Sequence, residues 1–194
     1  MSDNGRKGLH NAFVSMMHGL QLRLTDGTGR IPVKAEDLCK ALINELLRAS
    51  RNDVIVNAQN DIRHLIQMTD GKPKTGPVYE VACGPKEWKR PETVNPKVHL
   101  LREDAALIQF HLEVEELPDR LRLLSYSMEM WLPVGGVLPF VRLHLNPPSR
   151  ENADSGMRAH VHPGHDDIRL PTPILSPAEA LSFLLYDCAL PPAA

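Results

Sequence analysis

The sequence predicts an α+β domain, in which helices at both ends of the chain cover one face of a four-stranded antiparallel meander whose other face is polar. Two observations predict this architecture. Apolar residues recur at helical spacing before residue 70 and after residue 176, whereas hydrophobic and polar residues alternate in four segments between them. A length of 194 residues and an apolar content of 42% suit a single domain, residues 1–194, with a core of its own.

The first part of the chain, residues 1–69, is predicted to be helical. Its pattern indicates a short amphipathic helix over residues 9–20, a longer one over residues 34–50 and a third over residues 53–69. Asp53 is in position to cap the third helix, because its carboxylate can accept hydrogen bonds from the free N–H groups of the first turn.

Residues 70–97 are predicted to form a long basic loop, rich in proline, in which only "VYEVAC" has the composition of a strand. A connection of this length is usually functional or mobile. Trp88 lies among Lys86, Lys89 and Arg90, which makes these four residues a candidate substrate-binding segment where the indole could stack on a base and the cations could bind phosphates. The alternative is that Trp88 anchors the loop to the core.

The last part of the chain, residues 98–187, is predicted to form the antiparallel sheet and a terminal helix. The alternating segments cover residues 106–114, 123–132, 140–146 and 157–162. One face of each strand is apolar and the other polar, as expected for a sheet with one face on a core.

The terminal helix is predicted by its start signal. In "SPAEALSFLLY", Ser176 is the N-cap, Pro177 suits the first helical position and Glu179 completes a capping box.

The polar face of the last two strands carries the candidate site. Alternation predicts that the polar residues of 140–146 and 157–162 share a face if these strands are neighbours. They are Arg142, His144, Asn146, Arg158, His160 and His162. A solvated sheet surface usually carries threonine, lysine, glutamate and serine, so this set indicates a functional surface. The alternative is that the histidines near "HPGH" only mark the boundary of a type II turn.

One interpretation of this face is a site for a divalent metal such as Zn²⁺. His160 and His162 project to the same side of a strand and can bind one ion. The third ligand would come from His165, Asp166, Asp167 or His144; the set predicted first is His160, His162, His165 and Asp167.

A second interpretation needs no metal or other cofactor. Histidine can act as acid or base near neutral pH, and arginine binds phosphate oxygens through two parallel hydrogen bonds. The candidate catalytic residues are then His160 and His162 as the acid/base pair, Arg142 and Arg158 as phosphate-binding groups, and His144 beside them. Such a site would cleave an RNA phosphodiester.

Composition excludes several other classes of function. A formal net charge of −2 argues against nucleic-acid binding by bulk electrostatics. Three widely spaced cysteines form neither a disulfide framework nor a thiolate zinc motif, and a cytoplasmic protein is expected. No apolar run is long enough for a membrane span, so no membrane partner is expected. Signatures of nucleotide, dinucleotide and common hydrolase sites are missing.

Residues 105–186 resemble, weakly, the TumE-type toxins of bacterial toxin–antitoxin modules. The likeness lies in strands such as "LLSYSMEMWL" and "FVRLHLN", followed by a histidine-rich strand and a capped helix. It implies a toxin that inhibits translation and a cognate antitoxin as partner. The helical first part and the proline-rich loop are extra to that pattern.

A second likeness is to ubiquitin-conjugating-type domains, which also place "HPG" after a four-stranded meander. Their nucleophilic cysteine follows soon after this turn, but here the next cysteine is Cys188. This likeness therefore implies a non-catalytic binding module.

The hypothesis from sequence is an RNA-directed toxin or defence-type ribonuclease that uses the histidine and arginine side chains of the last two strands. The alternative is a non-catalytic binding subunit that docks a protein partner in a larger complex.

Overall fold

The structure is a computed structural model of the chain that describes residues 31–84, 90–133, 138–148 and 157–188. The predicted helix over residues 9–20, the residues Lys86, Trp88 and Lys89, and the proline-rich C-terminal end lie outside the described residues. The elements in chain order are α2 (Ala35–Arg51), α3 (Gln59–Leu65), β1 (Ile66–Asp70), β2 (Val78–Cys83), β3 (Leu100–Leu101), β4 (Leu107–Glu116), β5 (Leu121–Trp131), β6 (Phe140–Leu145), β7 (Ala159–Pro163), β8 (Leu170–Pro171), α4 (Pro177–Ser182) and the π-helical turn η1 (Phe183–Asp187).

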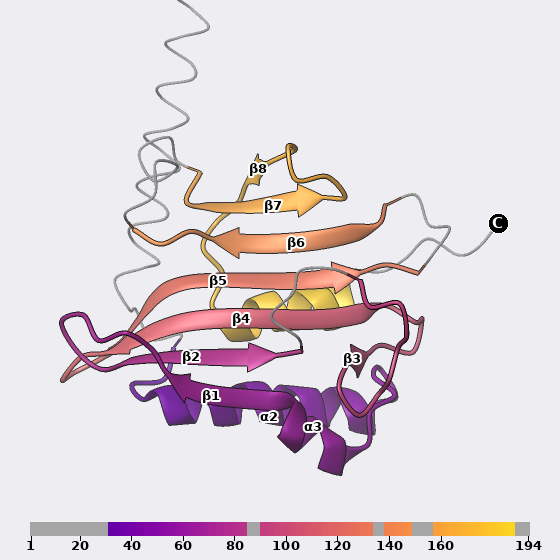
Figure 1. The fold of residues 1–194 in the computed structure, drawn as a ribbon, viewed down its shortest axis with the longest axis horizontal. Helices are drawn as coiled ribbons and strands as arrows, with labels where there is room; N and C mark the ends of the chain where they lie inside the picture. Colours follow the sequence, from indigo (N-terminus) through magenta and orange to yellow (C-terminus); the bar gives the residue numbers. More distant parts are fainter. Residues whose placement is uncertain (1–30, 85–89, 134–137, 149–156, 189–194) are drawn as a thin grey trace, which may run out of the picture.

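The strands form one antiparallel sheet in the order β1-β2-β4-β5-β6-β7-β8, with β3 paired to β4 (Figure 1). The predicted α+β class and antiparallel sheet are confirmed. The prediction of four strands is not confirmed, because the described residues form a sheet of eight strands. The four alternating segments form β4 to β7, neighbours in chain order, and the sheet continues past them on both sides.

The helices α2 and α4 lie on the same side of the sheet, behind it in Figure 1, and contact each other. The core lies between these helices and the sheet, where Leu42 and Leu46 of α2, Met128 of β5 and Leu181 of α4 are fully buried. The opposite face carries the polar residues, so the prediction of one apolar and one polar face agrees with the arrangement.

The predicted third helix is largely wrong. Only Gln59–Leu65 is helical, and Ile66–Asp70 is the strand β1, paired along its whole length with Val78–Cys83. Asp53 does not cap α3: it has a left-handed φ of 56° and lies outside the helix. Helical spacing of apolar residues continues past Leu65, but the long-range hydrogen bonds to β2 override this local preference.

The predicted long loop is interrupted by β2, at the strand-like segment that the sequence indicated. Arg90 is the one candidate substrate-binding residue that the structure describes. Its guanidinium donates a hydrogen bond to the main-chain oxygen of Leu132, just after β5. This contact ties the loop to the sheet.

The terminal helix begins with the predicted capping box. The main-chain N–H of Glu179 donates to the Ser176 hydroxyl at 3.3 Å, and the main-chain N–H of Ser176 donates to the Glu179 carboxylate at 2.8 Å. The end of the turn η1 is held by Arg102, whose Nη1 donates to the main-chain oxygens of Leu184 and Cys188. The closing segment is therefore fixed at both ends.

Candidate metal centre

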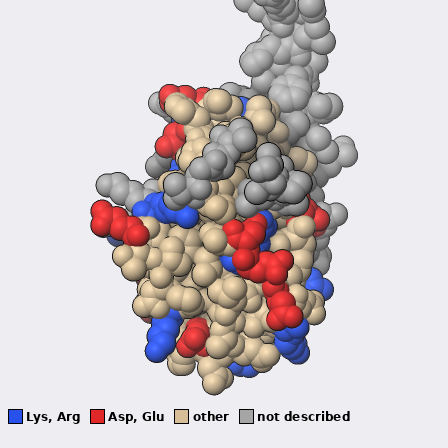
Figure 2. Space-filling model, turned by 90° about the vertical axis from the view of Figure 1, so that its right-hand side faces the viewer, with Lys and Arg blue, Asp and Glu red and all other residues tan. Residues whose placement is uncertain are grey.

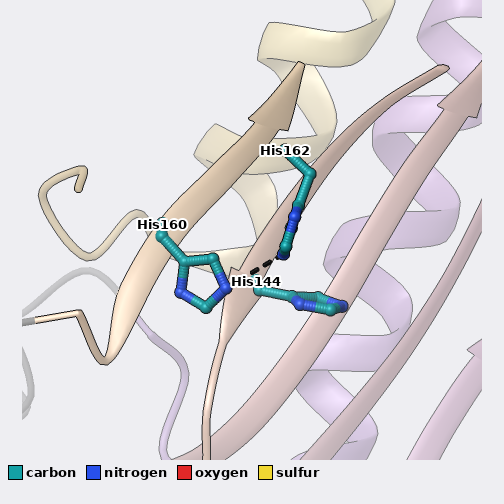
Figure 3. A group of neighbouring side chains, drawn as sticks. All are labelled: His144, His160 and His162. Carbon is teal, nitrogen blue, oxygen red and sulfur yellow. Dashed lines mark hydrogen bonds between the residues drawn. The ribbon is translucent and has the colours of Figure 1, made fainter. Parts of the chain in front are cut away.

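The pairing of β6 with β7 brings three histidines together (Figure 3). His144 lies directly opposite His160, and Arg142 lies opposite His162. This is the register that the alternation of polar and apolar residues requires, and the prediction that these side chains share a face is confirmed for His144, His160 and His162.

The three imidazole rings form a tight cluster. The Nε2 atoms of His160 and His162 are 3.1 Å apart, and one ring nitrogen from each of the three histidines lies within 4.8 Å of the others. The His144 ring stands nearly perpendicular to the other two, at centroid distances of 5.5 Å from His160 and 5.1 Å from His162. His160 and His162 are almost completely buried, with 1% and 3% exposure.

The hydrogen bonds set the proton positions on the rings. The main-chain oxygen of Met157 is 2.8 Å from Nδ1 of His160, so this nitrogen carries the hydrogen and Nε2 has a free lone pair. In the metal-free protein, Nε2 of His162 donates to that lone pair. The buried Nδ1 of His162 then has no well-formed hydrogen bond. Two nitrogen lone pairs, on Nε2 of His160 and Nδ1 of His162, are therefore buried here, and only the first accepts a hydrogen from the other ring.

The spacing fits the ligand shell of a tetrahedral metal ion. Bonds of about 2.05 Å from Zn²⁺ to imidazole nitrogen place neighbouring ligand atoms about 3.3 Å apart. His160 and His162 already have nearly this separation, and His144 would need to move by at most about 1.5 Å. Three histidines leave a fourth position for water or substrate. This cluster could therefore bind a divalent metal ion.

The electrostatic environment keeps the imidazoles neutral, which is the form that binds metal. Burial and the neighbouring histidines lower the pKa of His144 to about 3, and burial lowers the pKa of His160 to about 4. The pKa of His162 is lowered by burial and by the adjacent Arg142. Protons therefore compete weakly for these ring nitrogens near neutral pH.

A buried ionic network lies beside the histidines, in the cross-strand row that includes His162. Glu129 of β5, which is completely buried, accepts hydrogen bonds from Nε2 of Gln109 at 2.7 Å and from Nε and Nη2 of Arg142. Arg142 also donates to Asp166 at 2.5 Å and stacks over the Phe140 ring. Two carboxylates therefore neutralise Arg142, so it is not an open phosphate-binding group.

Other predicted site residues lie apart from the cluster. Nε of Arg158 donates to the main-chain oxygen of Asn146 at 3.0 Å, and Nη2 to that of Leu124 at 3.3 Å, so this guanidinium caps the sheet end. His165 and Asp167 are exposed and lie 3.7 Å from each other. Among the described residues, the group with metal-ligand spacing has His144 as its third member, without His165 or Asp167.

Sequence reasoning did not single out the buried residues of the inner strands. Glutamate and glutamine are common on solvated sheet surfaces, but Glu129 and Gln109 are buried. A usable signal was present in the strand register, which places Gln109, Glu129 and Arg142 in one row with His162. A glutamate opposite an arginine on a neighbouring strand predicts an ion pair.

Comparisons with known proteins give no family for this chain: no protein-family model, no curated protein and no solved structure matches it. In the part of the chain that the structure describes, no helix is both long and apolar enough to cross a membrane.

Proposed function

We propose that this protein binds one divalent transition metal ion, with Zn²⁺ as the best candidate, through His144, His160 and His162. One observation carries the proposal: three neutral imidazoles lie within ligand distance of one another, and His160 and His162 already have the separation of two zinc ligands. Imidazole nitrogen suits Zn²⁺ better than it suits Mg²⁺ or Ca²⁺, which prefer oxygen ligands.

The proposed activity is metal-assisted hydrolysis. A zinc ion with three histidine ligands and an open position lowers the pKa of a bound water and so supplies a nucleophile near neutral pH. A metal-free acid/base mechanism is less well supported. A general acid must hold a proton at the working pH, whereas the pKa of His160 is lowered to about 4.

The RNA-directed toxin or defence-type ribonuclease remains a proposal for the substrate and biological role of this site. A phosphodiester is a suitable substrate for a zinc-activated nucleophile. Figure 2 shows acidic and basic side chains interspersed on one side of the molecule instead of a continuous basic surface, so RNA binding would depend on local contacts. A cognate antitoxin would be the expected protein partner.

A non-catalytic subunit is the second candidate, and the burial of His160 and His162 favours it. Closed, buried metal sites usually serve folding, whereas catalytic sites keep an accessible position. In that case the metal would stabilise the protein without turnover, and the protein would act by docking a partner.

The test is a zinc-binding measurement on the full chain and four single variants. We expect wild type to bind one Zn²⁺ per chain in competition with a chromophoric chelator. We expect His144→Ala, His160→Ala and His162→Ala each to lose at least about tenfold in affinity. His165→Ala is the matched control, because this exposed histidine lies outside the cluster. Zinc binding that survives His144→Ala but not His165→Ala would refute the proposed ligand set.

Turnover then distinguishes the two candidate functions. The zinc-loaded protein is incubated with a fluorogenic phosphodiester and with an oligoribonucleotide, with and without chelator. Cleavage that requires zinc and is lost in His160→Ala supports hydrolysis. Zinc binding that raises the melting temperature without any cleavage supports the non-catalytic subunit.

A further inference from the structure

The edge of the sheet beyond the histidines brings one more cation to the proposed metal centre. β8 pairs with β7 so that Pro171 lies opposite His160 and Leu170 opposite Val161. Arg169 immediately precedes β8, so the alternation of side chains puts it on the same side as Pro171, which is the histidine face.

Arg169 contributes positive charge near the cluster. Burial is the main cause of the lowered pKa of His144, His160 and His162, and the Arg169 charge adds a smaller lowering to each. Arg169 is exposed, and among the described residues no carboxylate forms an ion pair with it. Arg142 differs in both respects, since it is buried and its charge is neutralised by Glu129 and Asp166.

A second polar group on this face also lacks a partner. Ser127 of β5 lies opposite His144, on the side of the cluster away from Arg169. Its hydroxyl oxygen is buried and makes no hydrogen bond. Buried hydroxyls in folded proteins nearly always have a partner. The unpaired Ser127 hydroxyl, together with the poorly hydrogen-bonded Nδ1 of His162, therefore suits a polar ligand on this face.

We propose that Arg169 binds a phosphoryl oxyanion whose remaining oxygens reach the metal held by His144, His160 and His162. This inference rests on the proposed metal centre and names the class of ligand that it takes, a phosphate ester. A tetrahedral phosphoryl group has enough oxygens to contact a metal ion and a guanidinium at the same time.

The charge balance favours phosphate over a neutral ligand. The three imidazoles are neutral, and the Glu129 and Asp166 carboxylates offset Arg142. Arg142 with its two carboxylates carries a net charge of −1, so a divalent ion and Arg169 would bring the net charge around one ligand to +2. A phosphate dianion compensates more of this charge than a carboxylate does.

The test is binding of inorganic phosphate to the zinc-loaded full chain, measured by titration calorimetry after the zinc content has been determined. Arg169→Gln is compared with Arg63→Gln, a matched variant of an exposed arginine on α3. We expect Arg169→Gln to weaken phosphate binding by about tenfold and to leave zinc content unchanged, because one charged hydrogen-bonding group is lost. Arg63→Gln should bind phosphate as wild type does.

Several outcomes would overturn the inference. It fails if zinc-loaded Arg169→Gln binds phosphate as tightly as wild type, or if acetate at the same ionic strength binds as tightly as phosphate. If wild type holds no zinc, the metal centre and this inference fall together, whereas normal zinc content with no phosphate binding refutes this inference alone. Inhibition of phosphate binding by phenyl phosphate or by an oligoribonucleotide distinguishes a small phosphate ester from RNA as the source of the group.

Discussion

Glu129 allows the clearest quantitative test of the buried ionic network. Its side chain is completely buried and accepts three hydrogen bonds, one from Gln109 and two from Arg142. Removing one partner of a buried ion pair typically costs about 3–5 kcal/mol, because it leaves an uncompensated buried charge. In Glu129→Gln the amide keeps the volume and one acceptor oxygen, and Asp166 still faces Arg142. We therefore expect a loss near the lower end, about 3 kcal/mol.

Asp166 provides the internal comparison, because it contacts the same arginine. Its carboxylate is 68% exposed, so solvent screens the interaction, and Asp166→Asn should cost at most about 1 kcal/mol. Urea unfolding at pH 7 measures both losses. With a slope of about 2 kcal/mol per molar urea, the midpoint of Glu129→Gln should fall by about 1.5 M. Equal losses for the two variants would refute the argument that burial decides the effect.

A double variant separates the network's charge from its packing. In Glu129→Leu combined with Arg142→Met, neither buried charge remains, so the stability should partly recover relative to Glu129→Gln; the recovery is incomplete because the buried Gln109 amide loses its acceptor. Lys40→Met is the surface control, because the Lys40 ammonium and its partner Glu36 are both largely exposed, and the midpoint should stay that of wild type.

Three further predictions concern the remaining parts of the fold. The metal-free protein should be most stable above pH 6.5 and lose stability as the pH falls towards 4. The reason is that the lowered pKa of each clustered histidine lets the unfolded chain bind more protons than the folded protein does. Thermal melts across this pH range should show a smaller loss of stability for His144→Ala than for wild type. Ser176→Ala should cost about 1 kcal/mol in urea unfolding, since the capping box is lost, and an unchanged midpoint would contradict its role. Gly164→Ala should lower the melting temperature, because Gly164 has a φ of 81° and a Cβ there would lie 2.9 Å from the Leu138 side chain; a melting temperature at or above that of wild type would show that this turn tolerates a side chain.

The class of fold was predictable because the four segments with alternating apolar and polar residues form the neighbouring strands β4 to β7. The missed strands lack such a signal. In β1, four of five residues are exposed in succession, so no alternation marks Ile66–Asp70 as a strand. The strands β3 and β8 have two residues each, too few to show any period. Their pairing depends on partners distant in sequence, which local patterns do not contain.

The candidate site was predictable to the level of a face but not to the level of a ligand set. Alternation fixes that His144, His160 and His162 share one side, because a register shift by one residue would expose the apolar side. Whether His144 or His165 is the third ligand depends on which of their side chains the fold brings close to His160 and His162. His165 lies in the turn beyond the strand, where alternation no longer constrains direction. Arg158 precedes β7 by one residue, and its side chain binds main-chain oxygens at the end of the sheet.

The histidine cluster contributes little to the stability of the metal-free fold, and this is the best argument that it has a function. It buries imidazole nitrogens with one hydrogen bond between His160 and His162 and leaves Nδ1 of His162 without a well-formed partner. An unsatisfied buried polar atom costs about 1–3 kcal/mol.

His162→Leu should therefore leave the metal-free protein within about 1 kcal/mol of wild type, because the lost hydrogen bond is offset by removal of that penalty. The same variant should abolish the rise in melting temperature that Zn²⁺ produces in wild type. If both imidazole nitrogens were well hydrogen-bonded, replacing the ring would leave their buried partners unpaired, at a cost of about 1–3 kcal/mol each without metal. A loss of that size in urea unfolding, with zinc stabilisation retained, would show that the cluster is structural.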